Sequence, residues 1–174
     1  MSKEDFMRRA IAIARDGMEG NAGGPFGAVI VKDGRIVAEG CNRVTSTNDP
    51  TAHAEVVAIR AACQKLGTFD LSGAEIYASC EPCPMCLAAI YWARLARIHY
   101  ASTREDAARI GFDDDHIYRE FAVPIEQRQI PMERLLATEA AAAFAAWEKK
   151  ADNYLAFVHF ACAWITWRAA GVFG

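Results

Sequence analysis

The stretch Cys80-Glu81-Pro82-Cys83-Pro84-Met85-Cys86 decides how this chain of 174 residues is interpreted. Proline is tolerated in a helix only within the first turn, so Pro82 and Pro84 predict a helix that begins here and runs to Ala93. Cys83 and Cys86 are three residues apart and therefore lie on the same face of that helix. Two cysteine sulfurs at this spacing are suited to binding a metal ion.

A second motif, His53-Ala54-Glu55, stands near the start of another predicted helix, residues 51–66. Together His53, Cys83 and Cys86 would leave the fourth tetrahedral position of a zinc ion open to water, as catalytic sites do. His53 and Glu55 are two residues apart and cannot share a lateral face, so a site that uses both must lie beyond the helix N-terminus. Glu55 is then expected to carry protons, because H-x-E followed by P-C-x-x-C is the signature of zinc-dependent base deaminases.

The rest of the chain alternates strand-like and helical patterns. A capping box, Ser2-x-x-Asp5, predicts an N-terminal helix over the first twenty residues, and Asp33-Gly34 predicts a hairpin turn between two short strands. Further strands are expected at 74–79, 95–101 and 130–136, a loop at 111–115 and a helix at 138–150. This order predicts a three-layer α/β/α fold with a central mixed five-stranded sheet flanked by helices.

Composition excludes several classes of partner. Hydrophobic residues make up 53% of the chain, enough for a core, while a formal net charge of −3 argues against binding nucleic acid through its phosphates. The N-terminus has no apolar run of signal-peptide length, so a cytoplasmic location is expected. The apolar run Leu155–Trp167 would be about 20 Å long as a helix, short of the roughly 30 Å bilayer core, so no membrane partner is expected.

The cysteines outside the predicted zinc pair have simpler interpretations. Cys41, Cys63 and Cys162 lie in apolar segments and are expected to be buried hydrophobic residues. Cys80 is expected to be a thiol at the end of a strand. If Cys80 instead supplied a fourth ligand, the zinc site would be closed and catalytically inert, which is the main structural alternative.

The sequence resembles the cytidine deaminase-like zinc deaminase superfamily and, within it, the bacterial guanine deaminases, over about residues 1–150. The zinc motif is shared with cytosine, cytidine and tRNA adenosine deaminases, whereas Gly-Phe-Asp-Asp is the more specific mark of the guanine deaminases. The segments that carry the resemblance are Gly23-Gly-Pro-Phe-Gly-Ala-Val-Ile-Val-Lys-Asp-Gly34, Asn48-Asp-Pro-Thr-Ala-His-Ala-Glu-Val56, Cys80-Glu-Pro-Cys-Pro-Met-Cys86, Ala89-Ile-Tyr-Trp-Ala-Arg94 and Gly111-Phe-Asp-Asp114.

The resemblance implies hydrolytic deamination of guanine to xanthine and ammonia. His53, Cys83 and Cys86 would hold the catalytic Zn²⁺, one per subunit, and Glu55 would move protons to the purine ring nitrogen and the departing ammonia. Asp114 would contact the guanine edge and assist proton transfer. A carboxylate accepts hydrogen bonds from the ring N–H and amino group of guanine but repels the bare ring acceptors of adenine or cytosine.

The resemblance also implies that Phe26, Asn42, Ala54 and Trp92 contact the base. From local pattern alone, Phe26 and Trp92 could equally be core residues, Asn42 could bond its own backbone, and Asp113–Asp115 could be a solvated acidic loop.

The C-terminus departs from the family. Residues 1–174 are expected to form a single deaminase domain, in which 151–174 is an atypical apolar extension. The resemblance implies a homodimer whose last helix is exchanged between subunits, with a C-terminal aromatic residue closing the partner's pocket. Tyr154 and Phe157 both stand near the expected position, and either could serve.

Other functions stay open on the sequence alone. Deamination of guanosine or cytosine differs from deamination of guanine mainly in the shape of the pocket. A tRNA adenosine deaminase would need a basic surface to hold a flipped nucleotide, against which the acidic balance and Asp114 argue. A non-enzymatic, zinc-stabilised module would require Cys80 to complete a closed site.

Overall fold

The computed structural model describes residues 1–148, and the chain divides into two compact units, Met1–Val123 and Pro124–Gly174. The first unit contains one sheet, in which β1 pairs antiparallel with β2 and β3, and β3 pairs parallel with β4. Within the described residues the sheet has four strands in the order β2-β1-β3-β4, not the five predicted. The strands are β1 (Gly27–Lys32), β2 (Arg35–Cys41), β3 (Glu75–Cys80) and β4 (Arg97–Ser102).

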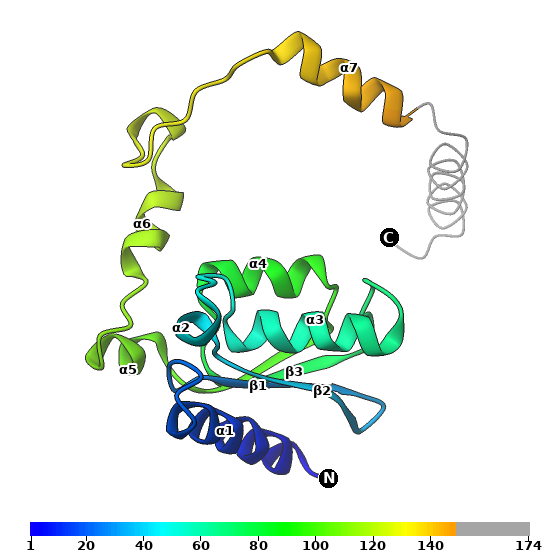
Figure 1. Ribbon diagram of the computed structural model, residues 1–174, viewed down its shortest axis with the longest axis vertical. Helices are drawn as coiled ribbons and strands as arrows, with labels where there is room; N and C mark the ends of the chain where they lie inside the picture. The colour runs from blue at the N-terminus through cyan, green and yellow to red at the C-terminus, as the bar shows by residue number, and fades with distance from the viewer. Residues whose placement is uncertain (149–174) are drawn as a thin grey trace, which may run out of the picture. The chain divides into compact units, whose positions relative to one another are not determined.

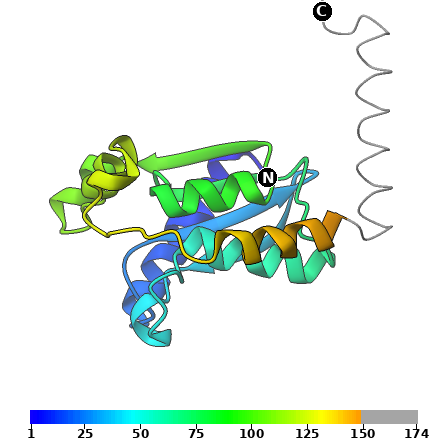
Figure 2. The same cartoon turned by 90° about the horizontal axis from the view of Figure 1, so that it is seen from above.

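Helices cover both faces of this sheet, which confirms the predicted three layers. Helix α1 (Lys3–Glu19) lies on one face, and α3 (Ala54–Leu66) and α4 (Pro84–Trp92) lie on the other (Figures 1 and 2). Strand β1 is buried on both sides because its side chains alternate: Ile30 belongs to the core under α3, and Val29 to the core under α1. The sheet therefore separates two apolar cores.

Several sequence predictions of local structure are confirmed. Ser2 and Asp5 form a complete capping box at the start of α1. The hairpin pairs Lys32 with Arg35 across the predicted turn. Helix α3 begins at Ala54, later than the predicted residue 51, because His53 is its N-cap and has an extended backbone.

Four short helical elements are absent from the sequence prediction. One of them, α5, has a clear local signal, since Thr103 and Asp106 form a second capping box. The elements are α2 (Val44–Thr47), α5 (Arg104–Arg109), α6 (Asp115–Ala122) and the 3₁₀ helix η1 (Ile125–Gln127).

The predicted strand at 130–136 is wrong. This segment is exposed and has no regular structure. Pro131 lacks a backbone donor, and the described part of the second unit holds only η1 and α7 (Ala137–Glu148), so it offers no strand to pair with. An extended segment needs such a partner for its backbone polar groups.

None of the helices within residues 1–148 combines the length and the apolar character that crossing a membrane requires. The predicted extension 151–174, with Tyr154, Phe157 and Cys162, lies outside the described residues.

Candidate zinc and substrate site

The three predicted zinc ligands meet where two helices begin. His53 is the N-cap of α3, Cys83 is the N-cap of α4, and Cys86 lies in the first turn of α4. The ligand atoms of the three residues all lie within 4.8 Å of one another, and His53 Nδ1 is 3.5 Å from each sulfur. Tetrahedral zinc, with bonds of about 2.3 Å to sulfur and 2.0 Å to nitrogen, places such atoms about 3.5 Å apart. The residues therefore fit a zinc ion.

The electrostatics of the two cysteines also suit a metal. A hydrogen bond from Cys86 lowers the pKa of Cys83 to about 4, and His53 adds to this effect. The hydrogen bond to Cys83 and burial raise the pKa of Cys86. Without metal the pair thus shares one proton, which a zinc ion displaces when it binds both sulfurs. The positive ends of the α3 and α4 dipoles also favour thiolate at this point.

Glu55 is placed beside the ligands without being one of them. Its side chain is 7% exposed, and the Cys86 thiol donates a hydrogen bond to Glu55 Oε2 over 3.4 Å. Burial raises the pKa of the Glu55 carboxyl above its ordinary value. A carboxyl whose pKa is raised in this way holds a proton more readily than an ordinary glutamate, which suits general acid and base work.

Cys80 does not complete the cluster. The metal-binding group found within residues 1–148 comprises His53, Cys83 and Cys86, and the Cys80 thiol donates instead to the Thr103 carbonyl oxygen over 3.5 Å. Burial raises the pKa of Cys80 to about 11, so it is a neutral thiol. The described ligand set has three members, which leaves a fourth tetrahedral position free for water or substrate.

A cavity of about 460 Å³ opens beside the cluster. It is lined by His53, Glu55 and Cys83 on one side, and by the predicted substrate residues Phe26, Asn42 and Asp114 on others. The structure thus brings six of the predicted site residues to one cavity. It does not bring Ala54 or Trp92 to the lining: Ala54 is buried in the core, and Trp92 is 84% exposed at the end of α4. Tyr154 lies outside the described residues.

Asn42 is oriented by the backbone around it. Its Oδ1 accepts hydrogen bonds from the N–H groups of Gly24 (3.2 Å) and Val44 (3.1 Å). Because the oxygen is occupied in this way, the amide nitrogen is the group left to donate to a ligand. Asn42 therefore supplies a fixed hydrogen-bond donor to a largely buried part of the cavity wall.

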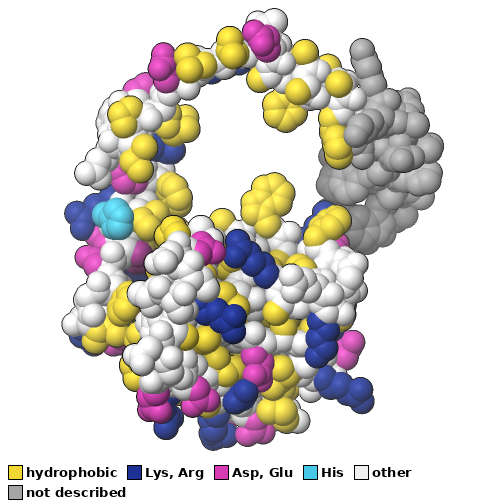
Figure 3. All heavy atoms as spheres, in the orientation of Figure 1, with side chains coloured by type: hydrophobic (Ala, Val, Ile, Leu, Met, Phe, Trp, Pro, Cys, Tyr) yellow, Lys and Arg dark blue, Asp and Glu magenta, His cyan; other side chains and the backbone are white. Residues whose placement is uncertain are grey.

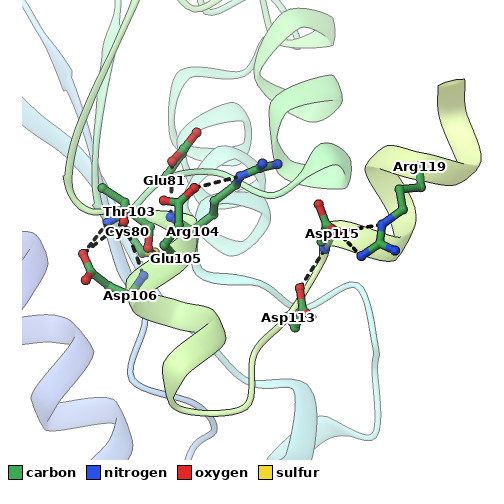
Figure 4. Close-up of polar contacts among 9 residues, drawn as sticks. All are labelled: Cys80, Glu81, Thr103, Arg104, Glu105, Asp106, Asp113, Asp115 and Arg119. Carbon is green, nitrogen blue, oxygen red and sulfur yellow. Dashed lines mark hydrogen bonds and ion pairs between the residues drawn. The ribbon is translucent and has the colours of Figure 1, made fainter.

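Asp114 supplies the opposite kind of group. It is the N-cap of α6, and burial together with the nearby Cys83 thiolate raises the pKa of its carboxyl. Its neighbours in the acidic loop are engaged elsewhere: Asp113 accepts from the Asp115 N–H over 3.0 Å, and Asp115 pairs with Arg119 (Figure 4). Asp113 and Asp114 both line the cavity, and because the Asp113 carboxylate already accepts the Asp115 N–H, the Asp114 carboxylate is the acceptor available to a ligand.

The further lining residues include Phe112, Glu81 and Arg104, for which no role in the site is predicted from the sequence. The N–H of Arg104 donates to the Glu81 carboxylate over 3.2 Å (Figure 4), and its guanidinium lies 4.7 Å from the centre of the Tyr118 ring. The capping box at Thr103 is the sequence signal that could have located Arg104, since it predicts a helix that begins there.

Comparison with known proteins yields a consistent set of relatives. The family model for the cytidine and deoxycytidylate deaminase zinc-binding region matches residues 1–102. Guanine deaminase of Bacillus subtilis is 54% identical over 153 residues, which cover 88% of this chain and 98% of that protein. Its X-ray structure superimposes with a TM-score of 0.84 over 87% of this chain and 96% of that one.

More distant relatives match a smaller part of the chain. A tRNA-specific adenosine deaminase of Agrobacterium fabrum is 47% identical over 97 residues, covering 56% of this chain and 63% of that protein. A structure solved in complex with 2,6-diaminopurine is 34% identical with a TM-score of 0.63, over 65% of this chain and 63% of that one.

Proposed function

Since this chain belongs to the family that has the cytidine and deoxycytidylate deaminase zinc-binding region, we propose that it is a zinc-dependent guanine deaminase, which converts guanine to xanthine and ammonia. One observation carries the proposal. Asn42 with its amide donor and Asp114 with its acceptor carboxylate line the same cavity as Glu55 and two of the zinc ligands, His53 and Cys83. Guanine offers ring acceptors to the first group, and a ring N–H and an amino group to the second.

The mechanism follows from what each residue can do. His53, Cys83 and Cys86 hold the zinc, which when bound acts as a Lewis acid and activates water as the nucleophile. Asn42 and Asp114 hold the base so that the carbon bearing the amino group faces the ligands. Glu55 would take one proton from the attacking water and donate it to the purine ring nitrogen. It would then take the second proton from the new hydroxyl group on that carbon and donate it to the amine as the C–N bond breaks. Its burial and raised pKa suit both steps.

The role of Glu55 is tested by Glu55→Gln. The amide keeps the size and one acceptor oxygen but cannot carry a proton, so we expect zinc content to stay at one per chain and kcat to fall at least about 100-fold. Ammonia release and metal analysis give the two numbers. Glu19→Gln, on the exposed side of α1, is the matched control and should behave as wild type. Near-normal turnover by the Glu55→Gln variant would remove Glu55 from the mechanism.

The substrate is tested by incubating the zinc protein separately with guanine, guanosine, adenine and cytosine, and measuring ammonia. Guanine should be turned over rapidly and adenine and cytosine should not, because the Asp114 carboxylate repels ring nitrogens that carry no hydrogen. Guanosine presents the same edge as guanine, so its turnover reports whether the cavity admits a ribose. A short tRNA anticodon stem-loop, incubated in the same way, tests the alternative that the protein is a tRNA adenosine deaminase. If another substrate is turned over and guanine is not, the proposal that guanine is the substrate is wrong, while membership of the deaminase family stands.

The homodimer with exchanged C-terminal segments is a second part of the proposal. Aromatic side chains stand exposed on α4 and β4: Tyr91 is 76%, Trp92 84% and Tyr100 51% exposed. Figure 3 shows hydrophobic side chains standing out over α4. Exposed aromatic groups of this kind favour an interaction surface. Trp92 would then act at the subunit interface, and the single deaminase domain over residues 1–174 would be completed by its partner.

Subunit exchange is tested by complementation. Glu55→Gln and Tyr154→Ala chains are each expected to have low activity. If Tyr154 closes the partner's pocket, mixing them restores activity, because a Tyr154→Ala subunit keeps Glu55 and receives Tyr154 from the other chain. A parallel mixture of Glu55→Gln with Phe157→Ala shows which of the two aromatic residues closes the partner's pocket. No recovery in either mixture, with mixed dimers shown by mass spectrometry, would overturn the exchange.

A cytoplasmic location completes the proposal. The five cysteines within the described residues are free thiols, as expected of a protein in a reducing compartment.

A further inference from the structure

The end of α5 determines where Phe112 points. The Gly111 N–H donates to the Ala108 carbonyl over 3.0 Å, and the Phe112 N–H donates to the Ala107 carbonyl over 3.1 Å. These two bonds define a Schellman motif. Gly111 has a φ of +92°, which a residue without a Cβ atom adopts without strain. The motif turns the chain back and places Phe112 at the position that commonly makes a hydrophobic contact.

Phe112 makes that contact with the opposite wall of the cavity. Its ring meets the Phe26 ring edge to face, with 4.9 Å between centroids and 87° between planes. A Cβ atom added to Gly24 would lie only 3.0 Å from Phe112 Cζ, so the ring lies directly against the Gly24 backbone. All three residues line the cavity. The loop after α5 is thus attached to the segment that leads into β1.

The segment that Phe112 contacts is the one that holds Asn42. Gly24 donates its N–H to Asn42 Oδ1 over 3.2 Å, and the Phe26 carbonyl accepts the Asn42 N–H over 3.0 Å. Phe112 therefore connects the part of the wall that carries the hydrogen-bond donor with the loop that carries the acceptor.

The backbone of Asp114 is held on its C-terminal side by α6, where the Asp114 carbonyl accepts the Ile117 N–H over 2.9 Å. Asp114 follows Phe112 by two residues, and its carboxylate makes no hydrogen bond or ion pair with another side chain anywhere in residues 1–148. Asp113, by contrast, accepts the Asp115 N–H at the start of α6, and Asp115 pairs with Arg119 of the same helix (Figure 4). The location of the Asp114 carboxylate therefore depends on the backbone on both sides of it: α6 follows it, and residues 111–113, which the Phe112 contact holds, precede it.

Resting on the proposed function, we propose that Phe112 is a positioning residue for Asp114. By lying against Gly24 and Phe26, the ring sets the distance between the Asn42 amide and the Asp114 carboxylate to the width of a purine base. The ring contributes to guanine turnover through Asp114 and not through a contact of its own.

The experiment is a double-mutant cycle with Phe112→Ala, Asp114→Ala and the double variant, measured as kcat and KM for guanine. Phe112→Ala should lower kcat/KM about 10- to 100-fold, the order that a misplacement of about 1 Å costs. If Phe112 acts through Asp114, the kcat/KM of the double variant should be within about threefold of that of Asp114→Ala, because the effects of substitutions at coupled residues are not additive. Phe69→Ala, which removes an exposed ring far from the cavity, is the matched control.

Two further readouts separate positioning from general damage. Zinc content should stay at one per chain, and hydrogen exchange should quicken at residues 110–116 of the Phe112→Ala protein while 84–92 is unchanged. If that protein loses zinc or folded structure, the cycle is run with Phe112→Leu, which keeps the apolar contact but not the flat ring edge.

The role of Phe112 would be overturned if the losses of kcat/KM in the two single variants multiply in the double variant, or if hydrogen exchange at residues 110–116 is unchanged. Turnover of guanine by the wild-type protein would still support the proposed function. If the wild-type protein binds one zinc per chain but does not turn over guanine, both the proposed function and the role of Phe112 are overturned.

Discussion

Two glutamates of this chain show how surroundings decide the behaviour of the same side chain. Glu55 is buried beside the zinc ligands, and burial raises the pKa of its carboxyl. Glu39 of β2 accepts two hydrogen bonds from Arg9 of α1, of 2.8 and 2.6 Å, and these lower the pKa of its carboxyl. The first glutamate is suited to proton transfer, and the second joins a helix to the sheet.

The Arg9 pair predicts a pH-dependent part of the stability. Because the folded pKa of Glu39 lies below its ordinary value of 4.5, the pair stabilises the fold above that pH, and this is lost as pH falls through the folded pKa. The pair is partly exposed, so Glu39→Gln should lower the free energy of unfolding by only about 0.5–1 kcal/mol at pH 7. Thermal melting should show a lower Tm for the variant at pH 7 and a smaller difference near pH 3. An equal difference at both pH values would contradict the prediction.

Among the elements, the contact between β2 and α3 is decisive for the site, because α3 carries His53 and Glu55 at its start. The contact is close because Gly40 has no side chain: an added Cβ atom would lie 2.4 Å from the Ala54 carbonyl oxygen and 2.6 Å from the Ala58 nitrogen. Both are backbone atoms of α3, which cannot turn aside as the end of a side chain can.

Gly40→Ala should therefore displace the start of α3. We expect a loss of about 1–3 kcal/mol in the free energy of unfolding, as overpacking typically costs, together with weaker zinc binding. Gly34→Ala is the control, since it has open space around it and a φ of +71°. Gly34→Ala should lower the free energy of unfolding by about 1–2 kcal/mol, because alanine is strained in a left-handed backbone conformation. It should leave zinc affinity unchanged. Competition with a chelator measures that affinity. Equal zinc affinity in both variants would argue against the displacement.

At the scale of the whole molecule, the zinc ion would connect two helices that the sequence separates. His53 stands at the start of α3 and the cysteines at the start of α4, so a bound ion crosslinks elements about thirty residues apart in the chain. The ligands are assembled only in the folded protein. Binding free energy therefore adds to folding stability.

Removing the metal should lower Tm. A ligand that binds only the folded state stabilises it by about 2.7 kcal/mol at 100 times its dissociation constant. Differential scanning calorimetry with and without a chelator measures the effect, and Tm should rise again with added zinc. Hydrogen exchange should quicken at the starts of α3 and α4 but not in α1. A Tm that is independent of zinc would contradict binding at this site.

The sequence by itself determined the parts of the site that depend on local spacing. Pro84 sets the start of α4, and the interval of three residues puts Cys83 and Cys86 together whatever the rest of the chain does. The three layers also follow from periodicity and turn residues.

Only the tertiary structure decided how distant segments meet. It assigned Oδ1 of Asn42 to backbone donors, placed Phe112 against Gly24, and left Cys80 out of the zinc ligands. It also left 130–136 without a strand partner in the described residues. The physical reason is common to all four: hydrogen-bond partners and packing contacts between segments far apart in sequence depend on the three-dimensional path of the chain, which local pattern does not encode.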